Sequence, residues 1–154
     1  MNKVFGFAIL ALAIGFSSCG KFDDDDVPTI SASQQIRNYL AQKNLTADSL
    51  SSGLYYIIEE PGEGENPTVN NTVVANYKGY FLSDVVFDQS SPGSPIDIPL
   101  TRVITGWQQG IPLFKKGGKG KLFLPPNLAY GASGQGGIPP NTVIAFDVEL
   151  IDFY

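Results

Sequence analysis

The stretch AYGASGQGGIPPN, residues 129–141, combines glycines, a tyrosine and two prolines in a pattern that could bind a ligand. A phosphate-binding loop of the Walker type would need Lys-Ser/Thr after its glycines and a helix beyond them. Here Ile138, Pro139 and Pro140 follow, then a strand-like run, and prolines have no backbone N–H to donate to phosphate. The pattern instead predicts a long ordered loop, whose glycines permit sharp turns and from which Tyr130 and Ile138 protrude as apolar groups.

The composition excludes several classes of catalyst. The 154 residues include no histidine and one cysteine. This excludes Ser-His-Asp and Cys-His nucleophile systems, zinc sites built on histidine and cysteine, and an intramolecular disulfide. We expect no metal and no cofactor, and a chemistry that uses Asp, Glu, Tyr, Lys, backbone groups or shape alone. The net charge of −5, without a basic patch, also predicts no nucleic-acid partner.

The first 19 residues predict an export signal. Lys3 precedes an apolar run, residues 4–16, that is too short to span a bilayer but fits the core of a secretory signal. Ser17-Ser18-Cys19 resembles the lipobox of bacterial lipoproteins, in which the cysteine is lipidated, although Phe16 replaces the usual leucine. We expect residues 1–19 to be a lipoprotein signal peptide with Cys19 as the lipidation site. The alternative is an ordinary signal peptide with an incidental cysteine.

Four adjacent aspartates, residues 23–26, follow the expected anchor. Like charges at this density repel one another and stay solvated, which predicts a flexible tether. The run also resembles the surface-export signals of lipoproteins in the Bacteroidetes. We therefore expect a location in the cell envelope, on the outer membrane and on either its periplasmic or its exposed face. The membrane would be contacted through the lipid anchor only.

Residues 31–44 predict a short helix that, with the tether, makes up the segment 20–50. Ser31 and Gln34 fit a capping box, and Asn44 suits a left-handed helix end. Ile36, Tyr39 and Leu40 have the spacing of one apolar stripe. We expect this stripe to pack on the main domain, and the chain to be a monomer because the helix is too short for a clear dimerisation segment.

Short strand-like runs punctuated by glycine and proline fill the chain from residue 51 to residue 154. Strands are expected at 54–60, 71–82, 120–125 and 141–154. In the last run, apolar Ile144, Phe146, Val148 and Leu150 alternate with Asp147 and Glu149, which is typical of a half-buried antiparallel strand. Only residues 106–114 suggest a helix among these strands, kept short by glycine and proline. The pattern predicts an α+β fold, an antiparallel sheet wrapped on one short helix.

Five motifs in order give residues 51–154 a close resemblance to the FKBP-type peptidyl-prolyl cis-trans isomerases. They are NYKGY at 76–80, VFDQS at 86–90, RVITGWQQGI at 102–111, KLFLPPNLAYG at 121–131 and GQGGIPPNTVIAFDVEL at 134–150. Each motif alone is weak, but together they are specific. The resemblance implies a curled antiparallel sheet of five or six strands around one short helix, with a pocket between sheet and helix.

The same resemblance assigns the pocket residues. Trp107 would form the floor, and the loop at 129–141 would overhang the pocket through Ile138. Tyr130 would donate a hydrogen bond to a ligand carbonyl, and Asp88 with Tyr77 would form the polar edge, so we expect Tyr77, Asp88 and Tyr130 to act in catalysis. The remaining apolar walls are expected from Phe87, Ile96, Val103, Ile104 and Phe146. Taken singly, each of these residues has a plainer interpretation as a core or surface side chain.

The sequence also departs from the family pattern. Ser83-Asp84 stands where many members have Asp-Gly, which we expect to alter the hairpin turn but not the pocket. The segment 89–101 is short and lacks the arginine that pairs with the pocket acid in some members. Ile96 replaces a common aromatic wall, so we expect a wider or differently shaped pocket.

The chemistry implied by the resemblance is rotation about X–Pro bonds, in proline-containing unfolded or partly folded polypeptides. An apolar pocket disfavours the polar planar amide more than the twisted transition state, so no nucleophile is required. Macrolides of the rapamycin type are further ligands that the resemblance implies. Two alternatives are a non-catalytic module that grips proline-containing segments, as a holdase or adhesion factor, and a structural lipoprotein with an inactive isomerase fold.

Overall fold

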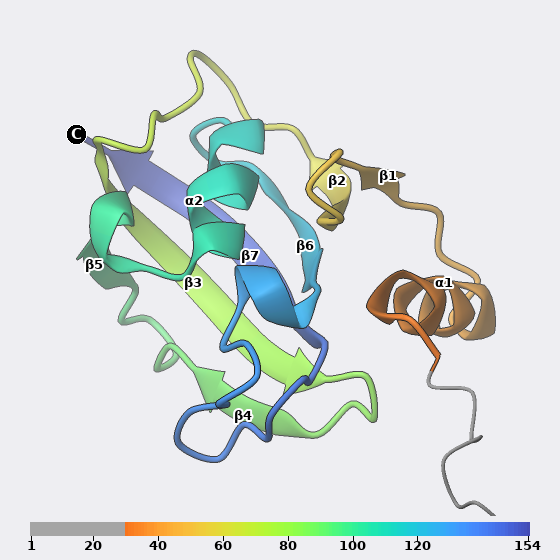
Figure 1. Ribbon diagram of the computed structural model, residues 1–154. Coiled ribbons are helices and arrows are strands. Elements are labelled where there is room, and N and C mark those ends of the chain that lie inside the picture. Colours follow the sequence, from red (N-terminus) through yellow and green to blue (C-terminus); the bar gives the residue numbers. More distant parts are fainter. Residues whose placement is uncertain (1–29) are drawn as a thin grey trace, which may run out of the picture.

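The computed structural model describes residues 30–154 and shows a curled antiparallel sheet with helices on both faces (Figure 1). Its strands are β1 (Asp48–Ser49), β2 (Tyr55–Glu60), β3 (Thr72–Phe81), β4 (Val86–Gln89), β5 (Ile96–Pro99), β6 (Lys119–Leu124) and β7 (Ile144–Phe153). The helices are α1 (Ala32–Gln42) and α2 (Thr105–Gly110), with 3-10 turns η1 (Leu100–Arg102), η2 (Ile111–Leu113) and η3 (Pro126–Leu128). The α+β prediction is confirmed. The expected signal peptide, Cys19 and the aspartates 23–26 lie outside the described residues.

The sheet has seven strands in the order β1-β2-β6-β7-β3-β4, with β5 also paired to β3. The five or six expected strands become seven because β1 is a two-residue strand, which already begins the sheet before the expected domain boundary at residue 51. Along one edge, β3 pairs first with β5, through residues 72–75, and then with β4, through residues 78–80. The chain therefore leaves the sheet between β4 and β5, beside the middle of β3.

One face of the sheet packs on α2, as the alternation in the last strand predicts. Ile144, Phe146, Val148 and Leu150 are buried in one core cluster with Trp107 and Ile111 of the α2–η2 segment. The expected helix at 106–114 is thus an α-helical turn followed by a 3-10 turn, because Pro112 cannot continue the ladder of helical hydrogen bonds. This cluster is the main core, and it packs α2 against the sheet.

The opposite face is covered by α1, whose expected apolar stripe and ends are confirmed. Ile36, Tyr39 and Leu40 are buried in a second cluster with Phe123 of β6 and Ala145 of β7. Ser31 Oγ accepts the Gln34 N–H at 3.2 Å, as the expected capping box requires. The return half of that box is wrong, because the Gln34 side-chain amide donates to Asn38 instead. The helix ends at Gln42 with Lys43 as its C-cap, and Asn44 follows in the expected left-handed conformation, with a φ of 54°. Because α1 buries Phe123 and Ala145 completely, β7 is covered on both faces here, and its expected half-burial is wrong at this end.

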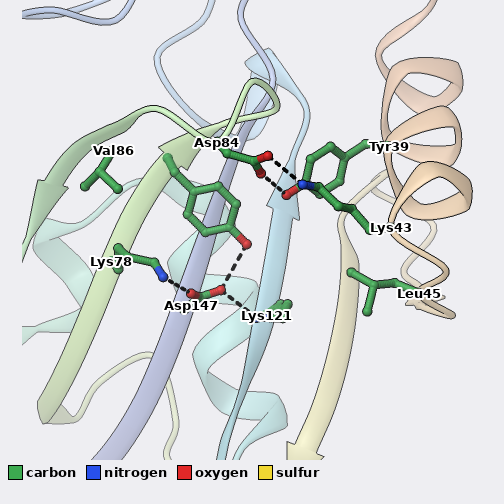
Figure 2. Close-up of a pocket in the computed structure, with 9 residues that line it drawn as sticks. Tyr39, Lys43, Leu45, Lys78, Asp84, Val86, Lys121 and Asp147 are labelled. Atoms are coloured by element: carbon green, nitrogen blue, oxygen red, sulfur yellow. Dashed lines mark hydrogen bonds and ion pairs between the residues drawn. The ribbon is translucent and has the colours of Figure 1, made fainter.

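The turn between β3 and β4 is fastened to α1. Asp84 adopts a left-handed conformation with a φ of 66°, which aspartate tolerates better than most residues. Its carboxylate accepts a hydrogen bond from the Tyr39 hydroxyl at 2.7 Å and pairs with Lys43 (Figure 2). Hydrogen bonds from Lys43 and Tyr39 lower the pKa of Asp84. Tyr39 of α1 and Lys43 at its C-terminal end therefore stabilise a turn that lacks the usual glycine.

A second carboxylate, that of Asp147, lies in the same groove between α1 and the sheet (Figure 2). Desolvation alone would raise its pKa, but hydrogen bonds from Lys121 and Lys78 outweigh this and hold the pKa below its usual range. The Tyr80 hydroxyl donates to the same carboxylate at 2.9 Å. Every charge in this groove has a partner within it or on its border: the contacts of Asp84 join the β3–β4 turn to α1, and those of Asp147 join β7 to β3 and β6.

Candidate functional site

A cavity of about 320 Å³ lies beside α2, where β3 exchanges β5 for β4 as its neighbour. We call it the aromatic cavity. The structure brings nine of the ten expected pocket residues to it, namely Tyr77, Phe87, Asp88, Ile96, Val103, Ile104, Trp107, Tyr130 and Phe146. They come from β3, β4, β5, α2 with the segment before it, the loop after η3, and β7. Residues far apart in the chain thus meet because the sheet curls around α2.

The floor of the aromatic cavity is Trp107, which is 4% exposed. Its ring packs edge-on against Tyr77, with the ring centroids 5.5 Å apart and the ring planes at 84°. It packs in the same way against Phe146, at a centroid distance of 5.5 Å and an interplanar angle of 83°. Edge-to-face pairs of this kind stabilise each ring by about 0.5–1.5 kcal/mol beyond simple burial. The indole Nε1–H is buried without an acceptor among residues 30–154. Buried polar groups without a partner are uncommon and are often found at functional sites.

One wall depends on the close approach of two phenylalanine rings to Gly79 on β3. A Cβ at Gly79 would lie 2.7 Å from the Phe87 ring and 2.8 Å from the Phe146 ring, closer than real Cβ contacts allow. Without that atom, the rings of Phe87 and Phe146 pack edge-to-face, with centroids 5.8 Å apart and an interplanar angle of 89°. The glycine in the NYKGY motif therefore has a packing role: it lets the wall close over the strand.

The polar edge of the aromatic cavity is built around Asp88. The Tyr77 hydroxyl donates to Asp88 Oδ2 at 2.7 Å, and the Gln89 N–H donates to Oδ1 at 2.9 Å. Burial and the hydrogen bond to Asp88 raise the pKa of Tyr77 to about 12. Burial, and then the charge of Asp88, also raise the pKa of Tyr130. Both phenols stay protonated at neutral pH, but Tyr77 is committed to Asp88, whereas Tyr130 donates to no side chain in residues 30–154 and is available to a ligand carbonyl.

The loop 129–141 is ordered by its own backbone hydrogen bonds, as expected. Gly134 N–H donates to the Tyr130 carbonyl at 3.1 Å, and Gln135 and Ile138 exchange a pair of hydrogen bonds at 2.9 and 3.0 Å. Ile138 is 8% exposed, belongs to the main core cluster, and does not line the aromatic cavity, whereas Gln135 does.

Three lining residues escaped the sequence analysis: Ile98, Arg102 and Gln135. Ile98 could have been found, because Ile96 and Ile98 are two residues apart in one strand and so share a face. Arg102 directly precedes the expected wall residue Val103, but its type suggests an ordinary surface side chain. No sequence signal distinguishes Gln135 from its neighbours in the loop.

The family model for FKBP-type peptidyl-prolyl cis-trans isomerases matches residues 63–151. The chain belongs to this family. The matched region contains every residue that lines the aromatic cavity. Among curated relatives, the FKBP-type peptidyl-prolyl cis-trans isomerase FkpA of Escherichia coli K12 is 42% identical over 137 residues, which cover 88% of this chain and 50% of the relative. A probable FKBP-type isomerase of Haemophilus influenzae is 41% identical over 112 residues, covering 71% of this chain and 46% of the relative.

Two solved structures share the fold described above. The crystal structure of Escherichia coli FkpA superposes with a TM-score of 0.71 at 43% identity, covering 77% of this chain and 57% of that chain. A peptidyl-prolyl cis-trans isomerase of Pseudomonas syringae pv. tomato gives a TM-score of 0.70 at 33% identity, covering 83% and 97%. The chain spans about half the length of the curated relatives named here. The likeness therefore concerns the FKBP-type domain and the helix before it.

Proposed function

We propose that this FKBP-type chain catalyses the cis-trans isomerisation of X–Pro bonds in unfolded or partly folded polypeptides. The observation that carries the proposal is the aromatic cavity, whose floor, Trp107, is held edge-on by Tyr77 and Phe146, with a protonated Tyr130 beside it. A proline ring suits such an apolar floor. The curated relatives named above carry the same activity in their names.

The reaction needs rotation about a bond whose barrier is about 18–20 kcal/mol because of amide resonance. The planar amide is more polar than the twisted transition state, so an apolar cavity favours the twisted form. Trp107 and the aromatic walls would hold the proline ring, and Tyr130 would donate to a substrate carbonyl. Asp88 would keep Tyr77 in place through their hydrogen bond. Each 1.36 kcal/mol of preference for the twisted form accelerates the rotation about tenfold.

The test is the isomerisation rate of X–Pro tetrapeptides with and without the protein. Uncatalysed isomerisation takes roughly 10–100 s at 25 °C, so acceleration is directly measurable. We expect acceleration for at least one peptide of the panel. If no peptide is accelerated, while clients with proline-containing segments are still bound or protected from aggregation, the chain is the non-catalytic binding module.

Replacing Tyr130 by phenylalanine tests the proposed carbonyl hydrogen bond. The variant keeps the ring and its packing but loses the donor. We expect kcat/KM to fall by about five- to tenfold, in line with about 1 kcal/mol for one hydrogen bond. Tyr77→Phe is the matched control for loss of a hydroxyl that donates to Asp88 rather than to substrate. Full activity of Tyr130→Phe would remove this hydrogen bond from the mechanism.

We further propose that residues 1–19 are a lipoprotein signal, that Cys19 is lipidated, and that the aspartates 23–26 tether the domain at the outer membrane of a Bacteroidetes-like envelope. Support comes from the sequence pattern. No helix in residues 30–154 is long and apolar enough to cross a membrane. Cells expressing the full chain should incorporate labelled palmitate into it, and Cys19→Ala should abolish the label. Label that survives in Cys19→Ala would contradict the anchor.

Two ligand and assembly proposals accompany this function. The domain 51–154, with the segment 20–50 as tether and helix, is proposed to act as a monomer, which light scattering would test. Macrolides of the rapamycin type are proposed to enter the aromatic cavity, where Ile96 forms part of the wall. Binding should change the fluorescence of Trp107, the single tryptophan of the chain. An unchanged spectrum at saturating macrolide would count against it.

A further inference from the structure

Arg102, the last residue of η1, is the one cationic side chain among the residues that line the aromatic cavity. It is exposed at the rim, directly before the wall residues Val103 and Ile104. The ion pairs within residues 30–154 use lysines, and none of them involves Arg102. A full positive charge thus stands at the entrance with no anionic partner among residues 30–154.

The acid of the same cavity, Asp88, does not neutralise this charge. Its two carboxylate oxygens accept from the Tyr77 hydroxyl and the Gln89 N–H, and no ion pair joins Asp88 to Arg102. The Asp88 carboxylate therefore accepts its hydrogen bonds from neutral donors. The cationic group has its whole guanidinium available to whatever enters the cavity.

The backbone that carries Arg102 is firmly placed. Leu100, two residues earlier, is fully buried, and its N–H donates to the Asn71 carbonyl at 3.0 Å. On the other side, the Val103 carbonyl accepts from the Gln108 side chain at 2.9 Å. The backbone of Arg102 is therefore fixed beside the cavity, directly before the wall residues Val103 and Ile104.

We propose that Arg102 determines specificity, favouring client segments that carry a carboxylate next to the isomerising proline. The proposal rests on the proposed isomerase function. A guanidinium presents paired donors that match a carboxylate in two-point geometry. The chain as a whole has a net charge of −5 and disfavours acidic partners, so an attraction for acidic clients has to arise locally. Arg102 supplies that attraction at the cavity.

The experiment compares neutral-capped tetrapeptides that differ only in Glu, Gln or Lys before the proline, and a second series with the same residues after it. Exchange rates are measured by NMR, without a coupled protease. For the full chain at low salt, we expect kcat/KM for the Glu peptide to exceed that for the Gln peptide by about two- to fivefold in one series, the range for exposed ion pairs. The ratio should approach one in high salt.

Two variants of Arg102 and one control decide the origin of this ratio. Arg102→Gln should bring the Glu/Gln ratio to about one, and Arg102→Glu should invert it and favour the Lys peptide. The control Lys115→Glu makes the same change in net charge as Arg102→Glu. Lys115 does not line the aromatic cavity and forms none of the ion pairs in the described part of the chain. The control should keep the wild-type ratio.

A wild-type Glu/Gln ratio of one in both series would overturn the proposal, and so would an equal change of the ratio in Lys115→Glu, which would indicate the overall field of the protein. Absence of acceleration for every peptide would instead refute the isomerase function. In that case Trp107 fluorescence gives the affinities of the Glu and Gln peptides, and equal affinities would overturn the role of Arg102 by itself.

Discussion

Trp107→Leu should lower kcat/KM for X–Pro isomerisation by about tenfold or more while the domain remains folded. The ring is the floor of the aromatic cavity and is held edge-on by Tyr77 and Phe146. Leucine fills part of the volume but offers no flat face to a proline ring. A loss of about 1.4 kcal/mol in transition-state binding is enough for a tenfold effect. Rates on tetrapeptides, with urea unfolding curves for the same samples, provide the measurement.

The control for this variant is Leu40→Ala, on the other face of the sheet. Leu40 is 6% exposed and packs in the second cluster with Phe123 and Ala145, away from the cavity. Its truncation should cost about 2–5 kcal/mol of stability, yet leave kcat/KM close to wild type below the unfolding transition. Full activity of Trp107→Leu would show that the floor does not contribute to catalysis. Equal losses in both variants would show that the assay reports stability alone.

Gly120→Ala should lower the free energy of unfolding by about 3 kcal/mol or more, at the upper end of overpacking effects. Gly120 lies in β6 opposite Ile58 of β2. A Cβ there would overlap the Ile57 carbonyl oxygen and lie 2.8 Å from the Phe114 ring. The first contact is with backbone in a paired strand, so the two strands would have to separate. Urea unfolding followed by circular dichroism measures the loss.

Gly137→Ala is the matched control, since nothing lies within 4 Å of a Cβ at that position. We expect its free energy of unfolding to stay within about 0.5 kcal/mol of wild type, as for most surface substitutions. If Gly120→Ala were as stable as Gly137→Ala, the close approach of β2 to β6 at this point would not be a feature of the protein in solution.

Much of the local structure could be predicted because it follows from neighbouring residues. The alternation from Ile144 to Leu150 marks the core face of β7. Ser31 and Asn44 mark the ends of the first helix. The fold and most cavity residues were reached through motifs that resemble a known family, since spacing alone would have left Trp107 and Phe146 as ordinary core residues.

Contacts between distant segments could not be predicted, because they depend on how the elements pack. The sequence predicted that Ile138 is an apolar group protruding from the loop, whereas in the folded domain Ile138 packs in the main core cluster and Gln135 lines the cavity. From the sequence, Asp84 was only part of a turn that lacks the usual glycine. Tyr39 and Lys43 stabilise that turn because α1 packs beside it.

By itself, the sequence determined the first helix, the four longer strands, the apolar faces and the absence of histidine-based chemistry, since these depend on composition and short-range periodicity; the short strands β1, β4 and β5 carry no such periodicity. Only the tertiary structure decided that α1 covers the second face of the sheet and that Arg102, beside an Asp88 hydrogen-bonded to Tyr77 and Gln89, lines the cavity without an ion-pair partner in the described part of the chain. The physical reason is that burial and charge pairing are properties of surfaces that meet, and those surfaces exist only after the sheet has curled around α2.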